Sequence, residues 1–316
     1  MLYRSAPGPT LARFDGPTAA RPTRLAVMAD PHVTPWATGT WKVFHRTVER
    51  FRTALTEANR LDVDAVAIAG DLTKDGAPQE FDRAAALLDE ANAPTLAVPG
   101  EHDLPQPEDG HRTPPVGTFA DRFAGGRYPF VERVAGIDLV GIDTATAGDG
   151  PPAVSPTQLD WLESILPGLE RPVVLCHHSL TPADVDGPPS TARIENDLEL
   201  ARVLDTGGVE LVVSGARHWP GTGALSGVRE VTAPATCSLP QAFLHVRIDA
   251  SGTTVDLVPL ADRTGFEEAY AAASDGDAHG QWVANRADQG ALHRFPLVDD
   301  RSNTTAATGE RASSGQ

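Results

Sequence analysis

The stretch RLAVMADPH, residues 24–32, is an apolar run that ends in an aspartate and a histidine. Two similar runs follow it, AVAIAGD at residues 65–71 and TLAVPGEHD at residues 95–103. Short, continuous runs of small and β-branched apolar residues are typical of buried strands. Each run therefore predicts a strand with polar or charged side chains just beyond its apolar part.

The same arrangement recurs twice further along the chain. Residues 172–176 lead into His177 and His178, and residues 209–213 lead into a loop that contains His218. In α/β proteins, ligands bind outside the carboxyl ends of strands, where the following loops lie side by side. We therefore expect five strand ends to bring aspartate, glutamate and histidine side chains to one edge of a sheet.

Helical periods separate the predicted strands. An amphipathic helix is indicated where apolar residues recur at intervals of three and four, at Trp41, Phe44, Val48, Phe51 and Leu55. Further strands without intervening helices are expected at residues 228–232, 242–248 and 253–257. This order of elements favours a mixed α/β sheet or a pair of sheets with helices outside.

The composition is that of a globular protein, with 41% hydrophobic and 22% charged residues among 316. The two cysteines lie in apolar or small-residue surroundings, which argues against a disulfide framework and for a reducing compartment. No apolar run reaches the length of a membrane span, and the start of the chain lacks the apolar core of a secretory signal. We therefore expect a cytoplasmic protein that does not enter a membrane.

Local composition divides the chain into four expected segments. These are a flexible N-terminal arm at residues 1–22, a folded domain at residues 23–262, a partly helical C-terminal extension at residues 263–299 and a disordered tail at residues 300–316. The arm and the tail are rich in small residues, proline or hydroxyl residues, and neither carries a hydrophobic period.

The chain is strongly acidic, with 26 lysines and arginines against 43 aspartates and glutamates and a formal net charge of −17. This charge argues against a nucleic-acid partner, which binds mainly to clustered cations. One hypothesis is an acidic surface adapted to a salt-rich cytoplasm, where short-range screening suppresses self-repulsion. The alternative is a GC-rich genome that favours arginine codons, since only Lys42 and Lys74 are lysines.

Taken in order, the strand-end residues form a recognisable series. They are Asp30-x-His32, Gly70-Asp71, Gly100-x-His102-Asp103, His177 and Gly215-x-x-His218. This series resembles the calcineurin-like metallophosphoesterase superfamily over roughly residues 24–258, and its context is most similar to class III cyclic nucleotide phosphodiesterase-like members. The resemblance implies a four-layer α/β/β/α sandwich of two mixed sheets and the hydrolysis of a small phosphoester.

A mixture of carboxylates and imidazoles suits divalent transition metals such as Mn, Fe, Zn or Co. The resemblance implies two ions: one held by Asp30, His32 and His218, and a second held by Glu101 and His177. Asp71 would bridge them, since a shared carboxylate offsets the repulsion between two nearby cations.

The resemblance also implies how the reaction proceeds. His102 would protonate the leaving oxygen as general acid, Asp103 would orient its ring, and a metal-bound hydroxide would attack phosphorus.

Two residues depart from the superfamily pattern, and both concern the second metal. Glu101 stands where asparagine is usual, and Ala216 stands where the first histidine of Gly-His-x-His is usual. We hypothesise that Glu101 binds bidentately and partly replaces the missing donor. The second site could also be weak or empty. The extra negative charge lowers the net positive charge of the centre, which favours a diester over a highly charged monoester.

Other readings of the chain stay open. A non-catalytic metal-binding scaffold would explain Glu101 and Ala216, although it would have no need of His102 as a proton donor. A nuclease is disfavoured by the charge. Arg217 is a weak candidate for binding substrate phosphate, with an outward salt bridge as the alternative, and His178 is expected to pack or form hydrogen bonds. The oligomeric state is left open.

Overall fold

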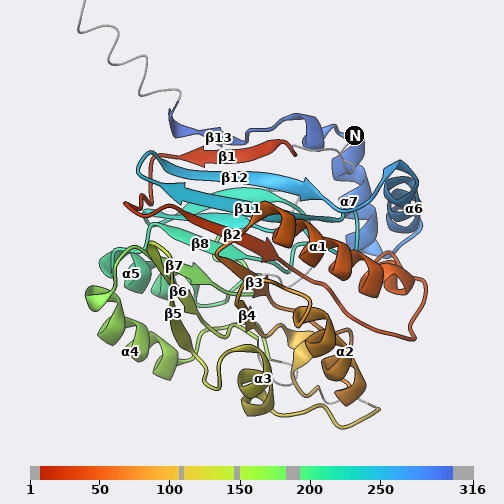
Figure 1. Ribbon diagram of the computed structural model, residues 1–316, viewed down its shortest axis with the longest axis horizontal. Helices are drawn as coiled ribbons and strands as arrows, with labels where there is room; N and C mark the ends of the chain where they lie inside the picture. The colour runs from red at the N-terminus through yellow and green to blue at the C-terminus, as the bar shows by residue number, and fades with distance from the viewer. Residues whose placement is uncertain (1–7, 107–109, 146–149, 183–192, 302–316) are drawn as a thin grey trace, which may run out of the picture.

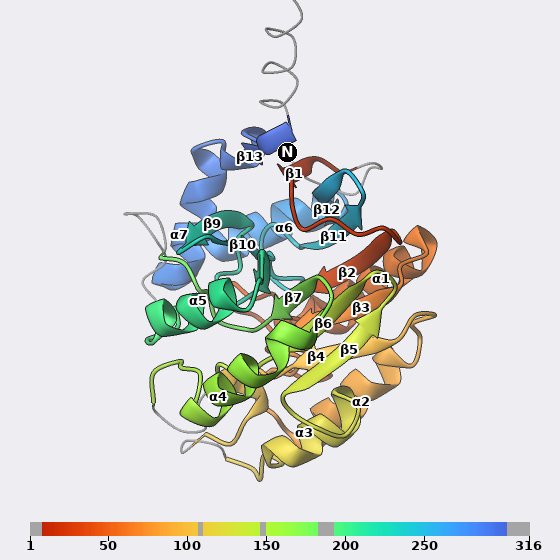
Figure 2. The same cartoon turned by 90° about the vertical axis from the view of Figure 1, so that its left-hand side faces the viewer.

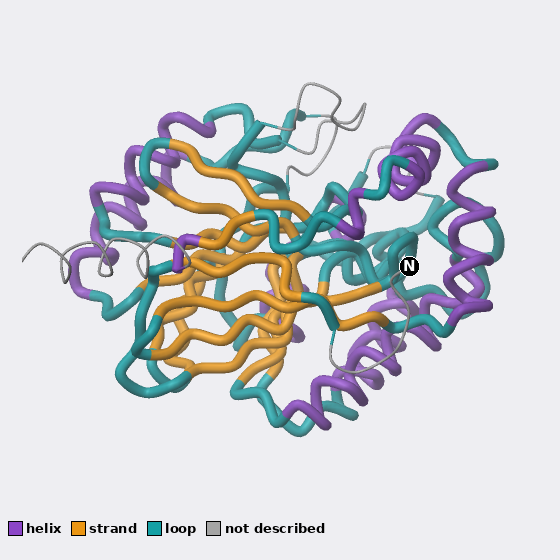
Figure 3. The backbone as a smooth tube through the Cα atoms, turned by 90° about the horizontal axis from the view of Figure 1, so that it is seen from above, coloured by secondary structure: helices purple, strands orange, loops and turns teal. Residues whose placement is uncertain are grey.

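The computed structural model describes residues 8–106, 110–145, 150–182 and 193–301. Two β-sheets face each other, and helices cover their outer faces (Figures 1 and 2). Seen from above, the strands lie in the middle of the molecule and the helices around them (Figure 3). This arrangement confirms the expected α/β/β/α sandwich.

The first sheet has seven strands in the spatial order β13-β1-β12-β11-β2-β3-β4. Their bounds are β1 Thr10–Phe14, β2 Thr23–Met28, β3 Ala65–Ala69, β4 Thr95–Val98, β11 Ala242–Asp249, β12 Gly252–Pro259 and β13 Val298–Asp299. The strands β2, β3 and β4 run parallel, so their carboxyl ends meet at the same edge. The other main pairings, β1 with β12, β12 with β11 and β11 with β2, are antiparallel.

The second sheet has six strands in the order β5-β6-β7-β8-β10-β9. Their bounds are β5 Phe130–Val134, β6 Ile137–Gly141, β7 Pro172–Leu175, β8 Leu211–Ser214, β9 Gly221–Leu225 and β10 Val228–Thr232. The strands from β6 to β10 in this order are parallel, and the two edge strands are antiparallel to their neighbours.

Seven helices are found in the described part of the chain. They are α1 Thr47–Leu61, α2 Pro78–Leu88, α3 Val116–Phe123, α4 Pro156–Ile165, α5 Asp197–Thr206, α6 Arg263–Ser274 and α7 Ala278–Asp288. The first three lie against the outer face of β2, β3 and β4, while α4 and α5 cover the other sheet (Figure 2).

Side-chain alternation along the strands explains why both faces of each sheet are apolar. In β3, Ala65 and Ala67 belong to the core between the sheets, whereas Val66 and Ile68 pack under the helices that carry Phe51 and Phe81. Successive side chains of a strand point to opposite faces, so a continuous apolar run serves both cores. Burial of a phenylalanine such as Phe51 contributes about 1.5–3 kcal/mol.

The expectation of a flexible arm is wrong for the described residues of the N-terminal segment. Thr10–Phe14 form β1, which pairs with β12 and β13, and Leu11 is fully buried. The strand is too short to show a period within a segment rich in proline and glycine. Residues 1–7 lie outside the described residues, as do residues 302–316 of the expected tail.

The C-terminal extension closes one end of the sandwich. Phe266 and Ala269 of α6 and Val283 of α7 are buried in the core between the sheets. The side chain of Asp277 caps α7 and also accepts a hydrogen bond of 2.9 Å from Nε1 of Trp41, which joins this extension to the loop after β2.

The helix expected from Trp41 begins later than the periodicity indicates. A short 3-10 turn occupies Phe44–Arg46, and α1 starts at Thr47, because Val43 adopts a left-handed conformation that breaks the helix. Trp41 instead packs beside the loop that carries His218. Within the described residues, no helix has the length and apolar character needed to cross a membrane.

Candidate metal centre

The predicted strand ends converge on one small volume. Ligand-type atoms lie within 4.8 Å of one another in four overlapping groups. The groups are Asp30 with His32 and His218, His32 with Asp71 and His102, Glu101 with His177 and His178, and Asp30 with Asp71 and His177. Asp71 belongs to two of these groups, one with His32 and His102 and one with Asp30 and His177.

The first cluster is fully enclosed by protein. Asp30, His32 and His218 are buried, and Nε2 of His218 lies 3.5 Å from Oδ1 of Asp30. Nε2 of His32 lies 3.4 Å from Oδ2 of Asp71, which places Asp71 beside this cluster. Nδ1 of His218 lies 2.8 Å from the hydroxyl of Ser238, and this contact fixes the direction of the opposite ring nitrogen.

Backbone strain is concentrated in these loops. Asp30, His32, Asp71 and His218 all have φ between 43° and 56°, in the left-handed region that L-residues rarely adopt. The loop after β2 is held to the loop after β3 by a backbone hydrogen bond of 2.9 Å from His32 N to Asp71 O. Such strain persists where the surrounding structure enforces it, and it is typical of functional sites.

The second cluster surrounds Glu101. Oε2 of Glu101 lies 3.0 Å from Nε2 of His177 and 3.1 Å from Nε2 of His178. Nδ1 of His177 donates to the carbonyl oxygen of Ala69 at 2.8 Å, so its Nε2 faces the cluster. Burial lowers the pKa of His177, but the charges of Asp71 and Glu101 outweigh it and raise the pKa well above the ordinary value, so a bound cation must also displace a proton from this nitrogen. Oδ1 of Asp71 lies 3.6 Å from the same Nε2.

The two clusters fit divalent cations because they contain buried polar atoms with no hydrogen-bond partner among the described residues. These atoms include both carboxylate oxygens of Asp30, Oε2 of Glu101 and Nε2 of His177. Leaving such atoms buried and unpaired costs about 1–3 kcal/mol each, and more for charged groups. One cation in each cluster would satisfy these atoms, and the mixed nitrogen and oxygen donors suit first-row transition metals.

Burial also changes how the carboxylates ionise in the metal-free chain. Burial raises the pKa of Asp30 to about 8, and a further contribution comes from Asp71. Burial, with the charge of Glu101, raises the pKa of Asp71 to about 6. Near neutral pH, Asp30 therefore holds a proton that a bound cation must displace.

Metal uptake is expected to depend on pH for this reason. Between pH 8 and pH 6, the apparent affinity for Mn²⁺ should fall by at least about tenfold per unit, because protons on Asp30 and His177 compete with the metal. Calorimetric titrations across this range, in buffers of different ionisation enthalpy, would measure both the affinity and the proton release. An affinity that is unchanged between pH 6 and pH 8 would contradict this prediction.

His102 lies at the open side of the centre. Its Nδ1 donates to the carbonyl oxygen of Lys74 at 2.6 Å, and its Nε2 lies 4.0 Å from Oδ2 of Asp71. The side chain is 35% exposed, so a substrate can reach it. Burial, together with the nearby Lys42 charge, lowers the pKa of His102 to about 4, and an anionic phosphate beside the ring would act in the opposite direction.

The expectation that Asp103 orients the His102 ring is wrong. The carboxylate of Asp103 accepts hydrogen bonds from the backbone N–H groups of Leu72, Thr73 and Gly100 at 2.8–3.0 Å and from the Thr73 hydroxyl at 2.7 Å. It therefore ties the loop after β3 to the loop after β4. The carbonyl of Lys74 orients the ring instead, which a residue pattern cannot reveal.

Lys42 is a site residue that the sequence analysis missed. Its Nζ lies 3.0 Å from Nε2 of His32, at the edge of the first cluster. The other lysine of the chain, Lys74, carries the carbonyl that orients His102, and its Nζ pairs with Asp75 at 2.6 Å. Both lysines of the chain thus lie at the metal centre. Because lysine is so rare in this sequence, their positions were a signal that could have pointed to this centre.

Gly70 shows how closely the loops approach. It has φ of +82°, and a Cβ added there would lie 2.2 Å from Nδ1 of His177. Gly70→Ala is therefore expected to lower the free energy of unfolding by about 2–5 kcal/mol, from left-handed strain and from overpacking.

Gly39→Ala is the matched control for Gly70→Ala. Gly39 has φ of +77° with nothing within 4 Å of an added Cβ, so this change should cost about 1–2 kcal/mol from the backbone alone. Urea denaturation of both variants would measure the difference, and equal losses would contradict the predicted clash at His177.

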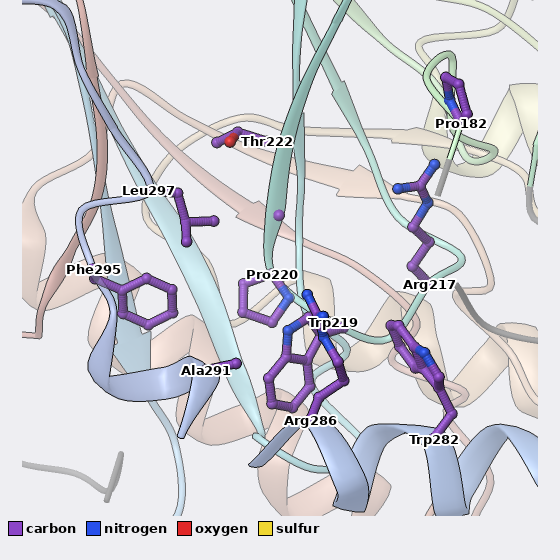
Figure 4. A pocket seen from close by; sticks show the side chains of 11 residues that line it. Pro182, Arg217, Trp219, Pro220, Thr222, Trp282, Arg286, Ala291, Phe295 and Leu297 are labelled. Carbon is purple, nitrogen blue, oxygen red and sulfur yellow. The ribbon is translucent and has the colours of Figure 1, made fainter. Parts of the chain in front are cut away.

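Arg217 does not face the metal centre. Its guanidinium donates to the carbonyl oxygen of Thr181, and the side chain lines a separate cavity of about 240 Å³ together with Trp219, Trp282 and Arg286 (Figure 4). His279 is half-buried beside this loop, and its Nε2 lies 3.1 Å from the carbonyl oxygen of Arg217.

A family model described as calcineurin-like phosphoesterase matches residues 23–220. Proteins from Rhodococcus erythropolis and Psychrobacter arcticus, both named "Probable cyclic nucleotide phosphodiesterase", are 25% and 23% identical over 185 and 178 residues. Each match covers 55% of this chain and 58% and 63% of the relatives, so the matched part spans less than two thirds of their length.

Solved structures show the same fold. A dimetal phosphatase from Danio rerio superposes with a TM-score of 0.59 at 15% identity, over 76% of this chain and 97% of that chain. Purple acid phosphatase PPD1 from yellow lupin gives a TM-score of 0.53 at 13% identity, over 78% and 54% of the two chains.

Proposed function

This chain belongs to the calcineurin-like phosphoesterase family, and we propose that it is a metal-dependent hydrolase of a small phosphodiester. The observation that carries the proposal is the convergence of buried carboxylates and imidazoles, in which the Asp30 carboxylate, Oε2 of Glu101 and Nε2 of His177 have no hydrogen-bond partner among the described residues. The names of the two relatives make a cyclic nucleotide the first substrate to test.

The proposed ligands follow the geometry of the two clusters. Asp30, His32 and His218 would hold one divalent transition metal, such as Mn, Fe, Zn or Co. Glu101 and His177 would hold the second, and Asp71 lies beside both clusters. Bound metals would neutralise phosphate charge and lower the pKa of a water nucleophile.

His102 is the proposed proton donor to the leaving oxygen. Its Nε2 lies 4.0 Å from Oδ2 of Asp71, at the edge of the centre, and its Nδ1 donates to the carbonyl oxygen of Lys74, so the ring is fixed in direction. Anionic substrate beside the ring favours the imidazolium form, which supplies the proton.

A diester fits the charge of this centre better than a monoester. Glu101 contributes a carboxylate where the family pattern has a neutral amide, so the second cation is more fully neutralised. A phosphodiester carries one negative charge, whereas a monoester near neutral pH carries up to two. The weaker positive field therefore disfavours the monoester.

Lys42 is expected to bind the phosphate group. When a metal takes the Nε2 lone pair of His32, the ammonium of Lys42 loses its present partner at 3.0 Å and is left beside the centre. A hydrogen bond to a charged group contributes about 1.5–3 kcal/mol, so Lys42→Met should lower kcat/KM by about ten- to a hundredfold.

Metal titration separates this role from a role in holding the metal. Lys42→Met should bind Mn²⁺ at least as tightly as the unaltered chain, because the lysine competes for His32, and Lys42→Arg should recover part of the activity. Weakened metal binding in Lys42→Met would contradict a role in substrate binding.

The experiment that tests the function uses metal-stripped protein with added Mn²⁺. Hydrolysis of bis-p-nitrophenyl phosphate, p-nitrophenyl phosphate and a cyclic nucleotide would be compared at low and high salt. We expect metal-dependent turnover with a preference for diesters. No metal-dependent turnover of any of the three would overturn the proposal, and higher kcat/KM for the monoester would overturn the substrate class.

A further inference from the structure

We propose that His178 is a metal ligand, and that Glu101, His177 and His178 form a second cation site that does without a histidine at position 216. This inference rests on the proposed function, because it concerns the same centre. It assigns a role to a residue that the sequence pattern places outside the ligand set.

The position of His178 depends on a bend after β7. Successive side chains of a continuous strand would point to opposite faces, which would turn His178 away from His177. The strand ends at Leu175, however, and the next residues form a bend. The two rings consequently lie 4.6 Å apart at an angle of 76°, with both Nε2 atoms close to one oxygen of Glu101.

Contacts behind the two rings fix their direction. Nδ1 of His177 donates to the carbonyl oxygen of Ala69, and Nδ1 of His178 lies 3.0 Å from the hydroxyl oxygen of Thr144. That oxygen also accepts a hydrogen bond from the backbone N–H of His178. Metal-bound histidines usually have such a partner on the ring nitrogen remote from the metal. Both rings therefore present Nε2 toward Glu101.

The atoms that converge are buried and incompletely paired. His177 is fully buried and His178 is 3% exposed, whereas the Glu101 side chain is 46% exposed with its Oε2 enclosed. Oε2 of Glu101 and Nε2 of His177 are 3.0 Å apart, yet neither has a hydrogen bond of acceptable geometry. A cation shared by the carboxylate and the two imidazoles would satisfy these atoms together.

With His178 as a ligand, the two departures from the family pattern, Ala216 and Glu101, compensate for each other. Ala216 has a methyl group that cannot coordinate, so one imidazole donor is lost from the loop after β8. Glu101 is one methylene longer than asparagine, and its carboxylate reaches His178 as well as His177. The missing donor is thus replaced from the β7 side of the centre.

The test is the number and affinity of bound metal ions, which can be read without any activity. Metal-stripped protein would be titrated with Mn²⁺ by calorimetry, and ions per chain would be counted by elemental analysis after desalting. We expect two ions in the unaltered chain and one in His178→Ala. The weaker site should lose more than about 100-fold in affinity, since even indirect partners of metal ligands account for about 10- to 100-fold.

Three further variants make the result specific. His245→Ala removes a buried histidine of β11 that belongs to none of the ligand groups, and it should retain both ions. His178→Gln keeps the size of the side chain in case the alanine variant does not fold. Ala216→His in the His178→Ala background should restore the second ion, because it returns an imidazole to the loop after β8.

The outcomes distinguish this inference from the proposed function. Two ions bound by His178→Ala with unchanged affinity would overturn the role of His178. One ion in the unaltered chain, with metal-dependent turnover of a diester, would overturn the second site and leave the proposed function standing. A third outcome is that the unaltered chain binds two ions, His178→Ala binds one, and no substrate is turned over. That result would overturn the proposed function and support the second metal site.

Discussion

His102→Ala is expected to lower kcat for an alkyl phosphodiester by about 10²- to 10⁴-fold, the usual contribution of a general acid. The reason is positional: the His102 side chain is partly exposed, its Nε2 lies 4.0 Å from Oδ2 of Asp71, and its Nδ1 donates to the carbonyl oxygen of Lys74. An alkoxide leaving group needs a proton as its bond to phosphorus breaks. A p-nitrophenolate leaving group is far more stable and needs the proton much less.

The two leaving groups therefore provide the measurement. His102→Ala should lose much more activity on an alkyl diester than on bis-p-nitrophenyl phosphate, while its metal content stays at the unaltered value. His45→Ala is a suitable control, since His45 is an exposed histidine paired with Glu268 and belongs to none of the ligand groups. Equal losses on both substrates would show that His102 binds phosphate and does not donate a proton.

The strands that end at the metal centre could be predicted from the sequence because they are buried on both faces. The strands β3 and β4 occupy the apolar parts of the runs at residues 65–71 and 95–103, and the strand expected at residues 228–232 is β10. A continuous apolar run is an unambiguous signal when both sides of a strand contact protein. The rule that ligands gather at carboxyl ends then placed the aspartates and histidines in one region.

Edge strands could not be predicted in the same way. The strand β5 has two exposed residues in its centre, and β9 is a half-buried edge strand with two glycines among five residues. Each packs one face at most and is too short for a period to emerge. The β1 strand was missed for the same reason, although its leucine is fully buried.

The directions of side chains in the loops could not be predicted from the sequence either. The sequence placed Asp103 beside His102, but the 3-10 turn at Glu101–Asp103 directs the carboxylate to backbone N–H groups. The alternation rule separated His178 from His177, but the bend after β7 turns both rings to Glu101. Lys42 lies at the centre because the loop after β2 contains several residues in the left-handed conformation, among them Thr40 and Val43. Such turns depend on contacts between distant segments.

Asp71→Asn is expected to change metal binding and stability in opposite directions. The carboxylate oxygens of Asp71 lie 3.4 Å from His32 and 3.6 Å from His177, one in each cluster, so its charge serves both proposed ions. A neutral amide should abolish one ion and weaken the other. Because metal ions supply several kcal/mol of stabilisation to the transition state, kcat/KM should fall by at least about 10³-fold.

Without metal, the Asp71→Asn variant should be more stable than the unaltered chain above pH 6. Burial raises the pKa of Asp71 from 3.8 to about 6, so keeping the carboxylate ionised in the folded state is costly at higher pH. The cost is absent below pH 3.8, grows between pH 3.8 and pH 6, and is complete above that range, at about 3 kcal/mol. The amide of the variant removes this cost, and its oxygen can still accept the hydrogen bond from the backbone N–H of His102.

Thermal unfolding with and without Mn²⁺, at pH 4.5 and pH 8, would check both parts of this prediction. In the absence of metal, Asp71→Asn should unfold at a higher temperature than the unaltered chain at pH 8, with a smaller difference at pH 4.5. With Mn²⁺ the order should reverse, because the unaltered chain gains more stability from bound ions than the variant does. If Asp71→Asn instead lowers the unfolding temperature at both pH values, with and without Mn²⁺, Asp71 is a structural carboxylate. A buried metal ligand should destabilise the fold only while its metal is absent.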